Sequence, residues 1–107
     1  MATIVRGPHD RFVKKIKSVL DEYEQANAGA VADVFRQNKA SIWIRIVDKR
    51  FGRMKRGERH DQVYDFLAER LDDDTLLEIS VLLPLAPREL ASSVMNAEFN
   101  DPIPSGF

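Results

Sequence analysis

The run LLEISVLL at residues 76–83 constrains the fold more than any other stretch of the chain. It is apolar almost throughout, a pattern typical of a strand that is covered on both faces or lies in the middle of a sheet. Before it lies a helical stripe of apolar residues, Val63, Phe66, Leu67 and Leu71, and before that a strand at residues 41–47. A strand, a helix and a neighbouring strand must form a parallel, right-handed unit.

The strand at residues 41–47, SIWIRIV, alternates between two kinds of face. Ile42, Ile44 and Ile46 point one way and predict a core face, whereas Trp43, Arg45 and Val47 point the other way. Residues 30–35, AVADVF, read as a strand, and the turn residues at 37–39 join the two strands into an antiparallel hairpin.

Two further helices complete the predicted order. Pro8 and Asp10 favour a helix start, and apolar residues then recur at helical spacing up to residues 27–29. The run DDD at residues 72–74 is expected to end the middle helix, and Pro87 to open a short last helix over residues 87–96. The sequence thus predicts an α+β fold, α-β-β-α-β-α, with a three-stranded mixed sheet and helices packed on one face.

Length and composition fit one soluble domain. The chain has 107 residues, 44% hydrophobic and 31% charged, and we expect a single domain over residues 1–96 with an extended or partly disordered tail over 97–107. It has no cysteine, which excludes a disulfide, a thiol nucleophile and an iron–sulfur cluster held by this chain alone. Without a signal-like segment or a run long enough to span a bilayer, the expected location is cytoplasmic, with no membrane contact.

The charge is unevenly distributed although the net charge is only −1. Basic residues dominate residues 45–59 and acidic residues dominate residues 61–78. A local positive patch can attract an anionic partner even when the sum is near zero. The candidate anion-binding or nucleic-acid-binding residues are Arg50, Arg53, Lys55, Arg56 and Arg59. The alternative is a solvated charged loop, because the segment matches neither a phosphate-binding nucleotide loop nor the two-glycine clamp of KH domains.

Two other sets of residues are candidates for binding. His60, between Arg59 and Asp61, is either a metal ligand or proton carrier or a surface residue at a helix start. On the outer sheet face, Phe35, Trp43 and Arg45 form either a partner surface or the bed for a tail that carries Phe99, Ile103 and Phe107. No catalytic triad or calcium-loop spacing occurs, so the expected function is not enzymatic.

The middle of the chain resembles the BolA family. The resemblance rests on IVDKRF at residues 46–51, the pair Arg59 and His60, VYDFLAERL at residues 63–71 and EISVLLPLAPRE at residues 78–89. Of the family's plausible metal ligands, only His60 is present here. The resemblance implies a fold similar to class II KH domains and a small binding or regulatory role.

The resemblance also implies a partner. A BolA-like domain is expected to pair with a monothiol glutaredoxin in iron–sulfur handling, with His60 contributing to a cluster bridged between the two proteins and no cofactor bound by the domain alone. The first alternative is a KH-like nucleic-acid-binding domain that uses the basic segment 49–59. The second is a protein-interaction module of unknown process, with Trp43 and the tail as its contact surface.

Overall fold

The computed structural model describes residues 1–103 of the chain; residues 104–107, which include Phe107, lie outside the described part. The elements, in chain order, are β1 (Thr3–Arg6), α1 (Arg11–Ala26), β2 (Val31–Asn38), β3 (Ser41–Val47), the 3-10 helix η1 (Lys49–Arg53), α2 (Arg56–Ala68), α3 (Asp73–Glu78), β4 (Ile79–Leu85), the 3-10 helix η2 (Pro87–Glu89) and α4 (Val94–Asn100).

The sheet is mixed and has four strands in the order β1-β2-β3-β4. β2 and β3 form the predicted antiparallel hairpin, and β3 and β4 are parallel, as the strand–helix–strand argument requires. The α+β class is therefore confirmed, but the predicted number of strands is wrong. The additional strand, β1, pairs in parallel with β2, opposite residues such as Asp33 and Val34.

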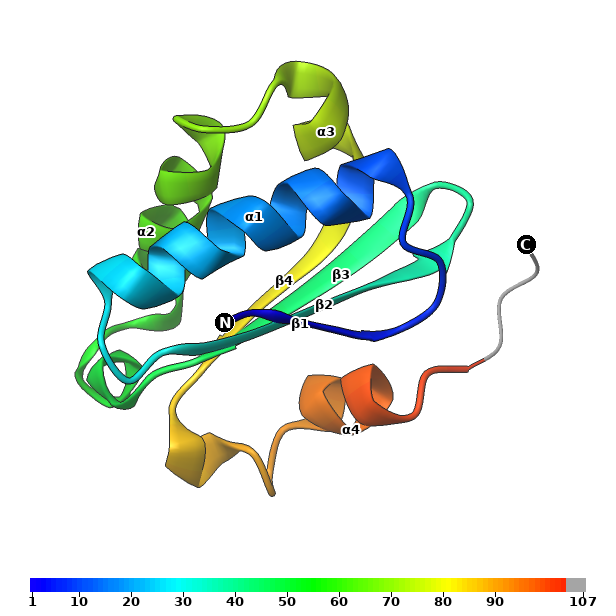
Figure 1. The fold of residues 1–107 in the computed structure, drawn as a ribbon. Helices are drawn as coiled ribbons and strands as arrows, with labels where there is room; N and C mark the ends of the chain where they lie inside the picture. Colours follow the sequence, from blue (N-terminus) through cyan, green and yellow to red (C-terminus); the bar gives the residue numbers. More distant parts are fainter. Residues whose placement is uncertain (104–107) are drawn as a thin grey trace.

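Helices cover both faces of the sheet, which corrects the expectation that they pack on one face. α1, α2 and α3 lie on one side of the sheet and α4 lies on the other, as Figure 1 shows. α4 covers the second face because Phe99 packs there against Phe35 of β2, with ring centroids 4.9 Å apart. The aromatic residues of the outer face therefore have a covering layer from the same chain.

The main core lies between the sheet and α1, α2 and α3. The side chains of Ile42, Ile44 and Ile46 are fully buried, and so is that of Leu67 from α2, which confirms the predicted face of β3. Phe66 is partly buried against this cluster. Asp10 caps α1 by accepting hydrogen bonds from the backbone N–H groups of the helix start, as its position in the sequence predicts.

Two segments near the end of the chain depart from the predicted boundaries. α2 ends at Ala68, and the acidic run begins a new helix, α3, instead of a turn. Asp73 and Asp74 lie in the first turn of α3, where the positive end of the helix dipole favours carboxylates. The apolar strand consequently starts at Ile79 and not at residue 76.

The last predicted helix is divided in two. Pro87 begins only the short η2, and α4 starts after Ser93, whose hydroxyl accepts a hydrogen bond from the N–H of Asn96 at 3.1 Å. The expected boundary between residues 96 and 97 falls inside α4. Residues 97–100, expected to be extended or partly disordered, are helical.

Candidate functional site

The basic segment is an ordered part of the fold rather than an open loop. Asp48 begins η1 by accepting a hydrogen bond from the N–H of Arg50 at 2.9 Å, and Phe51 in the middle of η1 is buried in the core. α2 then starts at Arg56, and Glu58 accepts a hydrogen bond from the N–H of Lys55 at 3.1 Å. The core contact of Phe51 therefore fixes the backbone from which the cationic side chains project.

Arg59 does not belong to the exposed cations, which corrects its place in the predicted anion-binding set. Its guanidinium is buried and pairs with both carboxylate oxygens of Glu89, at 2.6 and 2.9 Å. It also donates to the carbonyls of Met54 and Pro84. Arg59 thus joins the start of α2 to the end of β4 and to η2, and its donors face protein groups.

The pairing changes the acidity of Glu89. The hydrogen bonds from Arg59 lower the pKa of Glu89 from its ordinary value of 4.5 to about 2. The N–H of Ala86 adds a further hydrogen bond to the same carboxylate, at 2.8 Å. Because both bonds favour the ionised form, Glu89 carries its charge under physiological conditions.

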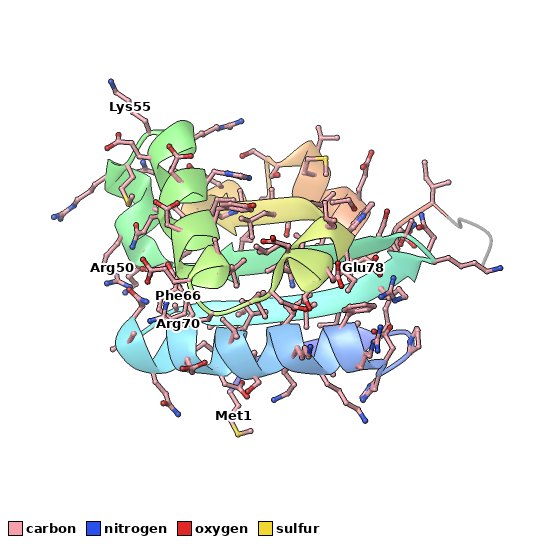
Figure 2. The ribbon with its side chains drawn as sticks, turned by 90° about the horizontal axis from the view of Figure 1, so that it is seen from above. Met1, Arg50, Lys55, Phe66, Arg70 and Glu78 are labelled. Atoms are coloured by element: carbon pink, nitrogen blue, oxygen red, sulfur yellow. The ribbon has the colours of Figure 1, made fainter. Side chains whose placement is uncertain are left out.

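Arg50 is engaged only in part. Its guanidinium donates to Asp48 at 2.5 Å, while its side chain remains about half exposed. Burial alone would raise the pKa of Asp48, but the hydrogen bonds from the Arg50 side chain and backbone bring it below its ordinary value. Within residues 1–103, no ion pair engages the exposed side chains of Arg53, Lys55 and Arg56. In Figure 2, Lys55 projects away from the start of α2.

His60 lies on the exposed side of α2, one helical turn before Tyr64. The two rings are nearly parallel, with an interplanar angle of 8° and centroids 6.2 Å apart. Both side chains are exposed. Tyr64 was not among the predicted site residues, although its i, i+4 spacing from His60 would have indicated that the two rings share one side of the helix.

The described residues do not form a metal site of their own. Within residues 1–103, no group of three or more histidine, cysteine, aspartate or glutamate residues could hold a metal ion. His60 supplies one imidazole, and His9, the other histidine, lies in the lead-in to α1. A cluster involving His60 would consequently require its other ligands from outside the described part of this chain.

The predicted partner surface is largely covered. Phe35 is buried, and Arg45 lies over the ring of Phe99 at 4.5 Å while donating to Asp33, Asn96 and Asn100. Trp43 and Arg45 remain partly accessible, and Trp43 lines a hollow of about 400 Å³. Of the two alternatives for this face, the structure supports the one in which the end of the chain covers it, through Phe99, whereas Ile103 is 76% exposed and is not buried there. The helical spacing of Asn96, Phe99 and Asn100 is the signal that would have indicated it.

Comparisons of the chain with protein-family models, with curated proteins and with solved structures found no match. The BolA resemblance therefore stays a prediction from the sequence. In the described part of the chain, no helix combines the length and apolar character that crossing a membrane requires.

Proposed function

We propose that the chain is a small, non-enzymatic, BolA-like binding domain of the cytoplasm that contacts a protein partner through η1 and the first turns of α2. One observation carries this proposal: the exposed rings of His60 and Tyr64 lie on α2, which begins at Arg56, the last of the exposed cations Arg53, Lys55 and Arg56. A surface that combines aromatic rings with cations is typical of protein interfaces. The order of α1, β2, β3, α2 and β4 also supports the proposal, because the BolA resemblance implies the same order.

The proposed partner is a monothiol glutaredoxin, and the proposed shared ligand is His60. Imidazole nitrogen is a good ligand for iron and zinc, and His60 is exposed to solvent on α2. Thiolates would come from the partner or from glutathione, because this chain has no cysteine. The contribution of this domain is then one ligand and the surface that holds the partner in place.

Replacing His60 with alanine is expected to abolish or shift the visible absorption and circular dichroism of a cluster reconstituted with a monothiol glutaredoxin. The reason is that the variant loses the one imidazole that α2 presents to the partner. His9→Ala is the matched control, because His9 is also exposed but precedes α1. Identical spectra for the native chain and His60→Ala, with both folded, would contradict the ligand role.

Nucleic-acid binding is the second candidate function, and the exposed cations favour it. Arg53, Lys55 and Arg56 lie next to one another along η1 and α2 without ion pairs inside the described chain. Such side chains can contact phosphates and release counterions. Arg59 is excluded from this role by its pairing with Glu89.

If these cations contact phosphates, affinity for a single-stranded oligonucleotide is expected to fall with rising salt. Neutralising Arg53, Lys55 or Arg56 to glutamine should then lower the slope of log affinity against log salt by about one for each residue. Lys14→Gln is the control, because Lys14 is exposed on α1. A slope that is the same in all of these variants would remove the nucleic-acid role.

A further inference from the structure

A groove runs along the outer edge of β4. β4 is an edge strand of the sheet, with α2 on one side of the sheet and the segment leading to α4 on the other (Figure 1). The groove has a volume of about 220 Å³. Its lining comes from both layers and the strand between them: Arg56, Arg59, His60, Leu82, Leu83, Pro84, Leu85, Ser93 and Met95. It is therefore a mostly apolar hollow with cationic and imidazole side chains on its α2 side.

The backbone of β4 offers one free pair of hydrogen-bonding groups in this groove. Successive residues of a strand direct their N–H and C=O groups to alternate sides. The Leu85 carbonyl accepts from the N–H of Asp48 beyond β3, whereas the Pro84 carbonyl accepts from Arg59 on the outer side. Leu82, two residues before Pro84, therefore directs its N–H and C=O outward, and within residues 1–103 no group outside the strand ladder bonds to them.

The same edge is closed to extension of the sheet. Pro84 has no N–H to offer, and its carbonyl is already bonded to Arg59. At the other end of β4 the register with β3 shifts, so that Ile42 is opposite Ile79 but Trp43 is opposite Val81. A proline and an irregularity of this kind both protect edge strands from pairing with another sheet. The groove thus suits a short extended segment and not the edge of a second copy of this chain.

The charge of the groove indicates the chemistry of that segment. Arg56 is exposed and forms no ion pair within residues 1–103, and His60 lies one turn further along α2. The carboxylate of Glu89 already pairs with Arg59, which lines the groove, at 2.6 Å. A carboxylate beside the groove would consequently meet a cation, whereas a lysine or arginine would meet repulsion.

We propose that the groove along β4 binds an extended peptide segment that places an apolar side chain against Leu83 and Met95 and a carboxylate beside Arg56. The backbone of the segment exchanges hydrogen bonds with the outward N–H and C=O of Leu82. This mode combines main-chain hydrogen bonds, which supply affinity, with a side-chain pocket and a charge, which supply specificity. The inference rests on the proposed protein-binding role and names the kind of sequence that the partner presents.

The test is a selection from a random peptide library on the intact chain, followed by anisotropy measurements with the enriched peptides. Met95→Lys puts a charge into the groove and should weaken binding about tenfold or more. Val94→Lys is the matched control, because Val94 is the neighbouring residue of α4, is 74% exposed and does not line the groove. N-methylation of the peptide at its anchoring residue should weaken binding by a similar factor if the backbone pairs with Leu82.

The expected result is enrichment of peptides with an apolar residue next to an acidic one. In Arg56→Glu, the preference for an acidic residue at this position should change to a preference for a basic one. Absence of enrichment, or equal binding to Met95→Lys and to the native chain, would overturn the proposal. Displacement of the peptide by a single-stranded oligonucleotide that binds more tightly would also overturn it, by assigning the groove to nucleic acid. A glutaredoxin complex that persists in Met95→Lys would overturn the groove as the place where this partner binds and leave the proposed function intact, so the two failures are distinguishable.

Discussion

Replacing Glu89 with leucine is expected to lower the free energy of unfolding by about 3 kcal/mol, because the charge of Arg59 then remains buried without its carboxylate. Arg59 would keep its hydrogen bonds to the carbonyls of Met54 and Pro84, but these neutral acceptors do not balance a full charge. Glu89 itself retains 23% of its side-chain exposure, which places the cost at the lower end of the usual range for buried pairs. Chemical denaturation measures the difference.

Two further variants define the control for this prediction. Lys15→Ala removes a pair with Asp72 whose two side chains are each 55% exposed, and its cost should stay below about 1 kcal/mol. A double variant that replaces both Arg59 and Glu89 with apolar residues should recover part of the loss, because no unpaired charge remains. A loss in Glu89→Leu no larger than that in Lys15→Ala would show that the pair contributes little.

The depressed pKa of Glu89 gives the same prediction a pH dependence. Hydrogen bonds from Arg59 lower this pKa to about 2. Between the ordinary pKa of 4.5 and about pH 2, the unfolded chain therefore binds the proton more readily than the folded chain. The stabilisation is present above the ordinary pKa of 4.5 and is lost as the pH falls toward about 2. The difference in stability between the native chain and Glu89→Leu should therefore shrink over this interval, and a constant difference would contradict the assignment.

Local sequence patterns predicted those parts of the fold that depend on neighbouring residues. The alternation in SIWIRIV placed Ile42, Ile44 and Ile46 on the core face, and helical spacing located α1. β1 was not predicted because it has only four residues and pairs in parallel with β2, from which it is separated by the whole of α1. Pairing of this kind leaves almost no local signal.

The candidate site likewise has a part that the local sequence predicts and a part that it does not. The run of cations was visible in the sequence, and Arg53, Lys55 and Arg56 are indeed exposed. Nothing local separates them from Arg59, whose burial depends on Glu89, thirty residues later in the chain. The groove along β4 could not be predicted either, because it combines a strand edge with side chains from α2 and from Met95 of α4.

The last helix raises a more general point about the sheet face that it covers. Phe35, Trp43 and Arg45 looked like an exposed contact surface because aromatic residues and an arginine share one side of the hairpin. The structure places Phe99 over them, with Arg45 held by Asn96 and Asn100 on the same helix. Residues that would fit a partner interface can equally bind the end of their own chain, and only the tertiary arrangement distinguishes the two.

Phe99→Ala is expected to cost about 3–5 kcal/mol, because Phe99 is only 1% exposed and the variant leaves a cavity between α4 and the sheet. The ring of Phe35, now at 4.9 Å from that of Phe99, would lose its edge contact, and Arg45 would lose the aromatic face beneath its guanidinium. Chemical denaturation should show the loss in a single transition if α4 folds together with the sheet.

The fluorescence of Trp43 provides an independent readout of the same variant, since Trp43 is the only tryptophan and its ring centroid lies 5.5 Å from that of Phe35. If α4 separates from the sheet while the main core of Ile42, Ile44 and Ile46 stays folded, Trp43 emission should move to longer wavelength before global unfolding begins. Val94→Ala, on the same helix but 74% exposed, should change the stability by less than about 0.5 kcal/mol and leave the emission unchanged. A cost near zero for Phe99→Ala would mean that α4 contributes nothing to covering this face, and Phe35 and Trp43 would again be candidates for a partner surface.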